Sequence, residues 1–296
     1  MFKNLDPASV GVHGSQSEII EATLSNGFKG LELDVAEFAE SVKLHGLPKA
    51  RRYFDSARLK IGSYRLPVRW TDEEAAYRAD LEKLRAALEL AKQIDCPRAI
   101  ATIDPASDIR PYHENFEVHR RRIDEIAGIL ARYNARLGLE FLAPVVLRKN
   151  RSFQFLQTAD AVLMLLKTIS APNVGLALDV WHWHLGGGTF EQLTALGAGK
   201  IVTLSLADAD PDATAETATD SQRRLPGETG VIEIVPLLTW LAGNKYDGPV
   251  TPRPSRSEFA GQGRDKIVKQ LGTSLDGLWK AAGLNPAGKL SPMAGV

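Results

Sequence analysis

The sequence contains a single cysteine, Cys96, and no excess of charge of either sign. One cysteine cannot form an intramolecular disulfide, which fits a protein of the reducing cytoplasm. The 36 Lys and Arg residues balance the 36 Asp and Glu residues. Because proteins that bind nucleic acid owe much of their affinity to a basic face that neutralises phosphates, this balance argues against a nucleic-acid partner.

Long apolar segments are also lacking. The longest purely apolar run is AVLMLL at residues 161–166, whereas a membrane-spanning helix needs roughly 20 such residues. The first residues, MFKNLDPASVGVHG, lack the apolar run of a signal peptide. We therefore expect a soluble, cytoplasmic protein with no membrane partner.

What the sequence does contain is an alternation of short β-type runs with amphipathic helical segments. Most of the runs are continuously apolar, which is typical of parallel strands covered on the outside by helices. Eight strand–helix units close most economically into a single (β/α)8 TIM barrel, which needs roughly 250 residues. An open doubly wound sheet is the alternative, but no glycine-rich phosphate loop follows the first run. The runs are SVGVH (9–13), GLELDV (30–35), LKIGSY (59–64), RAIATI (98–103), RLGLEF (136–141), VGLALDV (174–180), KIVTLSLA (200–207) and GPVTP (248–252).

The pattern predicts one barrel domain over residues 1–282 and a short irregular tail over 283–296, which is rich in Pro, Gly and Ala. Between the runs, Thr71 to Glu74 has the spacing of a capping box that would begin a helix. Apolar stripes at helical spacing follow it. Their members are Tyr77, Leu81, Leu84, Leu88 and Ala91 in that helix, Ile123, Ile126, Leu130 and Tyr133 in the next, and Ile267, Leu271, Leu275 and Leu278 in the last.

Polar residues at the carboxyl ends of the strands are the candidates for function, because active sites of such barrels lie there. Glu140 interrupts an apolar run, and a buried carboxylate is costly unless it is paired, hydrogen-bonded or bound to a metal. Asp179 and His182 lie three residues apart at a strand end and can converge on one ligand. A structural ion pair for Glu140 and a packed, hydrogen-bonded ring for His182 are the alternatives.

Four segments, in this order and spacing, resemble sugar-phosphate isomerase/epimerase proteins of the xylose-isomerase-like TIM-barrel superfamily: RLGLEFL, NVGLALDVWHWHLGGGT, RRLPGETGVIEI and YDGPVTPRP. The resemblance implies a divalent metal (manganese, magnesium or zinc) bound by Glu, Asp, His and Glu on strands 5 to 8. It also implies that the two glutamates exchange a proton beside a sugar carbonyl through a metal-stabilised enediolate. By this resemblance Glu140 and Asp179 correspond to the first two metal ligands, and His182 and Arg223 to substrate-binding residues.

The sequence departs from that family at the other two ligand positions. Ser205 stands in place of the histidine and Arg253 in place of the last glutamate. Glu140 and Asp179 alone would hold a divalent ion weakly, because affinity depends on ligand number and geometry. The family site, with three carboxylates and a divalent metal, has a net charge of −1, and Glu140, Asp179 and Arg253 together have the same net charge.

Three interpretations of this departure remain open. The Arg253 guanidinium could take the place of the metal, with charge-assisted bonds to Glu140 and Asp179. It could instead turn to solvent and leave a degraded pocket. A third interpretation is that His184, Asp208 or Glu258 completes a rearranged metal set.

The sequence therefore favours an isomerase or epimerase that acts on a small polyhydroxy carbonyl compound by proton transfer. One alternative is a metal-free or non-catalytic barrel that binds a sugar or sugar acid, and another is a carbon–oxygen lyase (dehydratase) of the same superfamily. Endonucleases of the superfamily need several metal-binding histidines and a basic face, which this chain lacks. Formation of a homo-oligomer is a further possibility. The candidate catalytic residues are Glu140 and Arg253, the candidate substrate contacts are His182, Arg223, Glu32 and His13, and the candidate metal ligands are Glu140 and Asp179.

Overall fold

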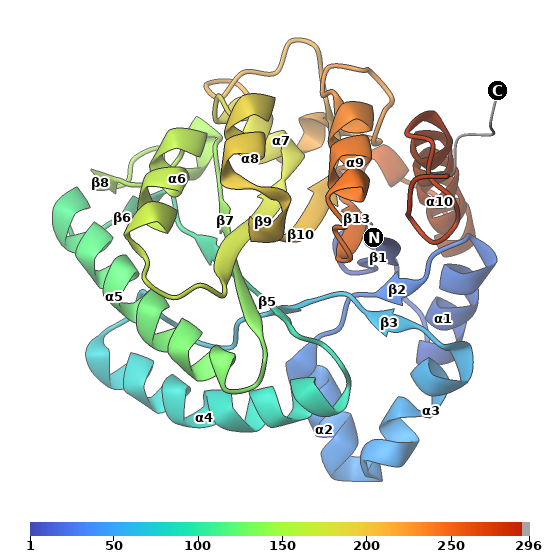
Figure 1. The fold of residues 1–296 in the computed structure, drawn as a ribbon, viewed down its shortest axis with the longest axis horizontal. Coiled ribbons are helices and arrows are strands. Elements are labelled where there is room, and N and C mark those ends of the chain that lie inside the picture. The colour runs from blue at the N-terminus through green and yellow to red at the C-terminus, as the bar shows by residue number, and fades with distance from the viewer. Residues whose placement is uncertain (292–296) are drawn as a thin grey trace.

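A computed structural model describes residues 1–291 and shows a barrel of parallel strands surrounded by helices (Figure 1). The strand segments pair in the order β3-β2-β1-β13-β10-β9-β7-β5-β4. Every neighbouring pair is parallel. The segments at the two ends of this order, β3 and β4, are joined by only Gly62 and Ser63, so the sheet closes on itself. The bounds are β1 Phe2–Leu5, β2 Gly30–Leu31, β3 Lys60–Ile61, β4 Tyr64–Arg65, β5 Arg98–Ile103, β7 Arg136–Phe141, β9 Val174–Asp179, β10 Ile201–Leu206 and β13 Pro249–Pro252.

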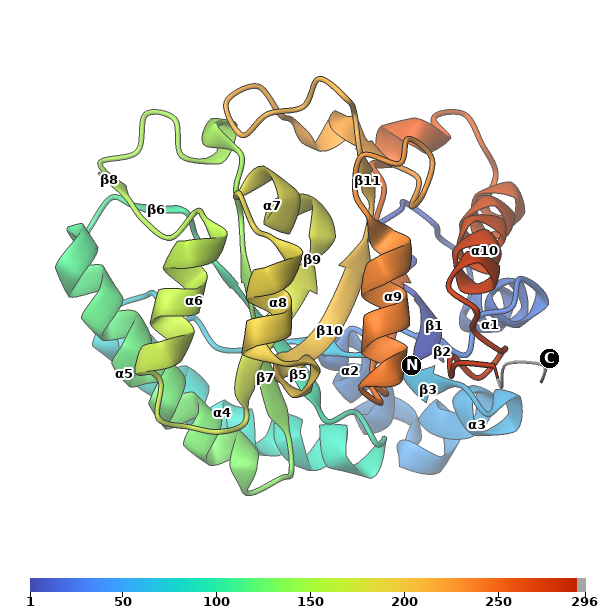
Figure 2. The same cartoon turned by 45° about the horizontal axis from the view of Figure 1, so that its top comes forward.

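The helices form the outer layer, and two small antiparallel pairs join loops beyond the carboxyl ends of the strands. These pairs are β6 (Ala106–Ser107) with β8 (Phe153–Gln154) and β11 (Asp208–Ala209) with β12 (Arg223–Arg224). Figure 2 labels β6, β8 and β11. No helix within residues 1–291 is long and apolar enough to cross a membrane. The helices are α1 Gln16–Ser25, α2 Val35–His45, α3 Leu47–Ala57, α4 Glu74–Gln93, α5 Tyr112–Ala131, α6 Ala159–Thr168, α7 Val180–Leu185, α8 Phe190–Leu196, α9 Ile234–Gly243 and α10 Arg264–Ala281.

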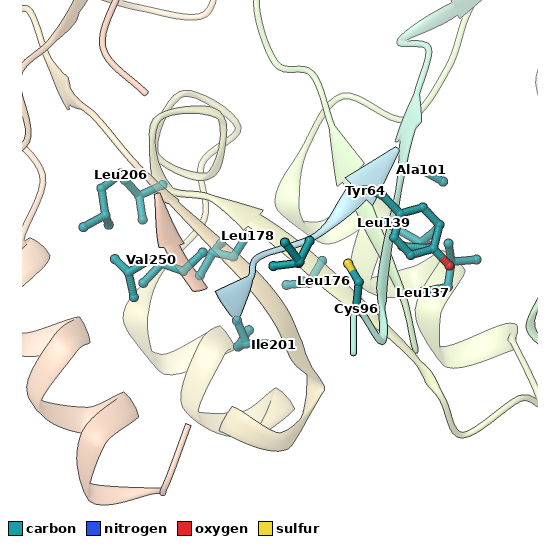
Figure 3. Packing of buried hydrophobic residues seen from close by; sticks show 14 of the residues in the cluster. Tyr64, Cys96, Ala101, Leu137, Leu139, Leu176, Leu178, Ile201, Leu206 and Val250 are labelled. Carbon is teal, nitrogen blue, oxygen red and sulfur yellow. The ribbon is translucent and has the colours of Figure 1, made fainter. Parts of the chain in front are cut away.

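One continuous apolar cluster fills the space inside the barrel and between the strands and the helices. Figure 3 shows Leu137, Leu176, Ile201 and Val250 within it. All six residues of β9 and all six of β10 are buried, as expected for strands that are covered on both faces. The apolar stripe predicted for α4 is buried along its whole length, and the stripe of α10 is buried likewise. The barrel prediction is confirmed.

The prediction for the first strand was wrong. Residues 9–13 form turns, and the first strand is Phe2–Leu5. The strand was missed because two of its four residues, Lys3 and Asn4, are polar. Both find partners in the fold: the Lys3 amine pairs with Asp276, and Asn4 donates a hydrogen bond to Thr251 Oγ1 over 3.0 Å. His13 therefore lies in an exposed loop and not at a strand end.

The predicted capping box was also wrong. Helix α4 begins at Glu74, and the residue at its N-cap, Glu73, makes no side-chain capping bond. The turn before the helix is held instead by Asp80, whose Oδ2 accepts from the backbone N–H of Arg69 over 2.9 Å. Strand β2 is shorter than predicted, because Asp34 caps α2 by accepting from two backbone N–H groups. Of the predicted tail, residues 292–296 lie outside the described residues.

Candidate active site

A cavity of about 1170 Å³ opens at the carboxyl ends of the barrel strands. This is large enough for a small polar ligand together with water. The position agrees with the general location of active sites in such barrels. The residues selected from the sequence all line it: His13, Glu32, Glu140, Asp179, His182, Ser205, Arg223 and Arg253.

Glu140, the fifth residue of β7, is buried and forms an ion pair with Arg253. The Arg253 Nη1 donates to Glu140 Oε1 over 3.0 Å, and the Thr102 hydroxyl donates to Oε2 over 2.7 Å. Thr102 lies directly opposite Glu140 in the pairing of β5 with β7. Both oxygens of this carboxylate are therefore satisfied without a metal ion.

Asp179 ends β9 and at the same time caps the next helix. Its Oδ1 accepts from the backbone N–H groups of Trp181 and His182 at 3.0 and 3.3 Å, and its Oδ2 accepts from Arg223 Nη2 at 2.5 Å. Burial opposes ionisation, but Arg223, His182 and Arg253 outweigh it and hold the pKa of Asp179 below its usual range. The capping bonds turn the chain so that His182 faces the cavity.

His182 is buried, and burial holds the pKa of its ring below the ordinary value although Asp179 acts in the opposite direction. The backbone N–H of Ala143 donates to Nδ1 over 3.4 Å. In a neutral ring that accepts at Nδ1, the proton sits on Nε2. His182 can therefore donate a hydrogen bond to a ligand oxygen in the cavity.

Arg223 comes from β12, beyond the end of the barrel, and binds two parts of the site together. Its Nε donates to the carbonyl of Arg253 over 2.9 Å, and its Nη2 holds Asp179. The guanidinium also lies over the Trp181 ring, 4.8 Å from its centroid. In the sequence, Arg223 was indicated only by the order of the segments that resemble the family. No local pattern predicted its contact with Trp181.

Arg253 lies directly after β13, and its backbone N–H donates to Leu206 of β10 over 2.7 Å. Burial disfavours its charge, but Glu140, Asp179, Asp6 and Glu32 around it raise its pKa above the ordinary value. The prediction that this guanidinium binds Glu140 is confirmed, and the alternative that it turns to solvent is wrong. The predicted bond to Asp179 is not found among the described residues, where Arg223 holds that carboxylate instead.

The residues of this site do not fit a divalent metal ion. Glu140 is bonded to one guanidinium and Asp179 to another, so a cation between them would face two fixed positive charges. Ser205, in register with both Asp179 and Thr251, offers only a neutral hydroxyl. Within residues 1–291 no group of three or more His, Cys, Asp or Glu side chains could hold a metal ion.

The three residues that could have completed a rearranged metal set are placed elsewhere. Glu258 pairs with Arg224, and His184 is exposed on α7. Asp208 is fully buried, and its two oxygens accept from the backbone N–H groups of Ala209, Thr229, Gly230 and Ile232. None of the three lines the cavity. Asp208 instead fixes the loop before α9.

The substitution Asp208→Asn is therefore expected to destabilise the fold without touching the cavity. An amide places an NH2 group against two of the four backbone donors, and loss of such charge-assisted bonds costs about 3 kcal/mol. Urea unfolding followed by circular dichroism measures this loss. Asp212→Asn, an exposed change in the segment between β11 and β12, is the control and should leave the free energy of unfolding unchanged. Equal effects of the two substitutions would contradict the assigned role.

Three residues that hydrogen-bond to the carboxylates of the cavity were not selected from the sequence. Thr102 supports Glu140, while Asn4 and Ser63 donate hydrogen bonds to Glu32. Thr102, in the run RAIATI, lies beside Glu140 because of the register in which β5 pairs with β7. Knowledge of this register would have been needed to select Thr102 from the sequence. Asn4 belongs to the strand that the sequence misplaced. Glu32 itself lies just beyond β2, whereas the strand predicted over residues 30–35 included it.

Comparisons with known proteins agree with this architecture. A family model described as xylose isomerase-like TIM barrel matches residues 20–275. The inosose isomerase of Halalkalibacterium halodurans is 24% identical over 255 residues, which cover 84% of this chain and 86% of that protein. The solved structure of a xylose isomerase domain protein from Alicyclobacillus acidocaldarius has a TM-score of 0.84 and 25% identity, covering 95% of this chain and 99% of that one. The structure of IolI, described with a bound zinc atom, has a TM-score of 0.77 and 19% identity, covering 96% and 98%.

Proposed function

The chain belongs to the family of xylose isomerase-like TIM barrels, and from this premise we propose that it is a sugar isomerase or epimerase that works without a metal ion. The observation that carries the proposal is the ion pair of Arg253 with Glu140, 3.0 Å long, inside the cavity at the strand ends. It gives the site a fixed cation beside a carboxylate. These are the two groups that proton transfer next to a carbonyl requires.

In the proposed reaction Glu140 takes a proton from the carbon next to the carbonyl of a polyhydroxy ketone or aldehyde. The electron pair of the broken C–H bond forms the C=C bond of an enediolate, and the carbonyl π pair moves onto oxygen. The Arg253 guanidinium stabilises that oxygen by charge and hydrogen bonds. Return of the proton to the same carbon from the other face gives an epimer. Its return to the former carbonyl carbon, with transfer of the hydroxyl proton from one enediolate oxygen to the other, gives an isomer.

His182 and Arg223 hold the substrate during this transfer. The Nε2–H of His182 can donate to a hydroxyl or carbonyl oxygen in the cavity. Arg223 uses Nε and Nη2 for Arg253 and Asp179, so its position is fixed before a ligand arrives. A preformed site of this kind loses little conformational entropy when substrate binds.

The proposal is tested with metal-free protein, inosose and D-fructose in D2O. We expect loss of the proton signals next to the carbonyl in the NMR spectrum, at a rate that prolonged treatment with a chelator leaves unchanged. Stoichiometric zinc or manganese in the purified protein, with activity that the chelator abolishes, would overturn the metal-free site. Saturable binding of these compounds without exchange or conversion would overturn the enzymatic role in favour of a binding barrel.

A further inference from the structure

Glu32 lies on the wall of the cavity away from Glu140, inside a cluster of polar residues. We call Asn4, Glu32, Ser63 and Thr251 the Glu32 cluster. Asn4 Nδ2 donates to Glu32 Oε2 over 2.9 Å and to Thr251 Oγ1 over 3.0 Å, and the Ser63 hydroxyl donates to Glu32 Oε1. The cluster joins four neighbouring strand positions, from β13 through β1 and β2 to the junction of β3 with β4. Glu32 is thus held in one orientation.

Two glycines leave the space in which the Asn4 amide sits. A Cβ atom at Gly62 would lie 2.5 Å from both Oδ1 and Nδ2 of Asn4, and one at Gly30 would lie 2.7 Å from Oδ1. Either contact is far inside van der Waals distance. The Asn4 Oδ1 is buried and accepts no hydrogen bond within the described chain. A neutral Glu32 carboxyl could donate to this oxygen after the amide turns over.

The surroundings of Glu32 allow it to carry a proton near neutral pH. Burial, with the negative charge of Asp6, raises the pKa of Glu32 to about 7, against the opposing effects of Ser63, Asn4 and Arg253. The Cys96 thiol lies near enough for Glu32 to contribute to the raised pKa of that group. Asp6 and Arg253 are thus the charged groups that act on Glu32. In contrast to Asp179, Glu32 can both give and accept a proton at neutral pH.

The two carboxyl groups approach the cavity from different walls. In the strand order, the β3–β4 position and β5 separate β2 from β7, so Glu32 and Glu140 lie three positions apart around the barrel. Both line the same cavity. Arg253 lines the same cavity, and both carboxylates are near enough to raise its pKa. A substrate oxygen bound to Arg253 would therefore lie near both carboxyl groups.

We propose that Glu32 is a second catalytic carboxyl group, which exchanges a proton with the substrate from the wall opposite to Glu140. This inference rests on the proposed isomerase or epimerase function. Glu140 removes the proton and Arg253 stabilises the enediolate oxygen. The protonated Glu32 then donates its proton to carbon, the C=C electron pair forms the new C–H bond, and the carbonyl re-forms. In the reverse direction the two carboxyl groups exchange roles, so the pair must hold one proton at the start of either direction.

The test separates proton removal from product formation in the variant Glu32→Gln. In D2O this variant should still lose the substrate C–H signal, because Glu140 remains, while conversion of inosose or D-fructose to an isomer or epimer falls by about 100-fold or more. A residue with only a structural role would lower both rates together. Glu40→Gln, an exposed change on α2 away from the cavity lining, is the matched control and should leave both rates unchanged.

Ser63→Ala gives a second readout, because Ser63 is a positioning residue that acts through Glu32. Conversion by the wild-type protein should decline above pH about 7, as the pair loses its single proton. The Ser63 hydroxyl lowers the pKa of Glu32, so its removal should move this decline to higher pH. An unchanged pH profile in Ser63→Ala would overturn the assignment.

The outcomes distinguish this inference from the function on which it rests. Wild-type protein that neither exchanges nor converts either compound overturns the proposed function and the role of Glu32 with it. Wild-type conversion that Glu32→Gln retains in full overturns the role of Glu32 alone. Equal loss of exchange and conversion in a folded Glu32→Gln protein also overturns it, because Glu32 would then act before or outside the return of the proton.

Discussion

The double variant Ser205→His, Arg253→Glu is expected to bind zinc at least about 100-fold more tightly than the wild-type protein, a gain of about 3 kcal/mol. The substitution at residue 253 removes the cation that occupies Glu140 and adds a carboxylate. The substitution at residue 205 adds an imidazole in register with Asp179. Together with Glu140 and Asp179 these groups form the Glu, Asp, His and Glu set that the family resemblance implies, and four ligands of these types suit zinc.

Isothermal titration calorimetry with zinc measures this gain, and each single variant serves as a control. Ser205→His should add little affinity, because the Arg253 guanidinium still repels a cation. Arg253→Met removes the repulsion without adding a ligand and should bind less tightly than the double variant. Equally tight zinc binding by the wild-type protein, or none by a folded double variant, would contradict our description of the site.

Arg253→Met is expected to lower both stability and activity. Glu140, whose side chain is 6% exposed, would keep a buried charge without its partner, and breaking such a pair costs about 3 kcal/mol. Loss of the group that stabilises the enediolate oxygen should slow conversion by about 100-fold to 1000-fold. Urea unfolding measures the first effect, and conversion of inosose or D-fructose in protein that is still folded measures the second.

A second substitution separates the two effects of Arg253→Met. Adding Glu140→Gln removes the unpaired buried charge, so the double variant should regain stability but remain inactive. A double variant that regains activity would contradict the role of Arg253.

The barrel could be predicted from the sequence wherever a strand is mostly apolar. The runs at 98–103 and 136–141 coincide with β5 and β7 to the residue. Strand β1 was not predicted because it contains Lys3 and Asn4. These residues can be buried only through their contacts with Asp276 and Thr251, which form when the barrel closes. An apolar pattern cannot detect a polar residue whose partner lies some 250 positions away in the chain.

Most members of the site were predictable, but of their pairings only that of Arg253 with Glu140 was predicted. The strand ends indicated Glu140, Asp179 and Arg253, since polar residues stand out after apolar runs. That Arg223 holds Asp179 depends on the path of the loop between β10 and β12, which no local pattern determines. The surroundings of Glu32 depend on Asn4, so the misplaced first strand concealed them.

The positive charge of Arg253 is part of the polypeptide. The backbone of this residue is held on both sides, because its N–H donates to the Leu206 carbonyl and its own carbonyl accepts from Arg223. A metal ion must be captured from the surroundings, in competition with every other protein that binds it. A guanidinium is supplied once by translation, in every molecule, and stays ionised at any pH that a cell tolerates. The protein would thereby be independent of metal supply, and its chemistry could be adjusted only by changing its sequence.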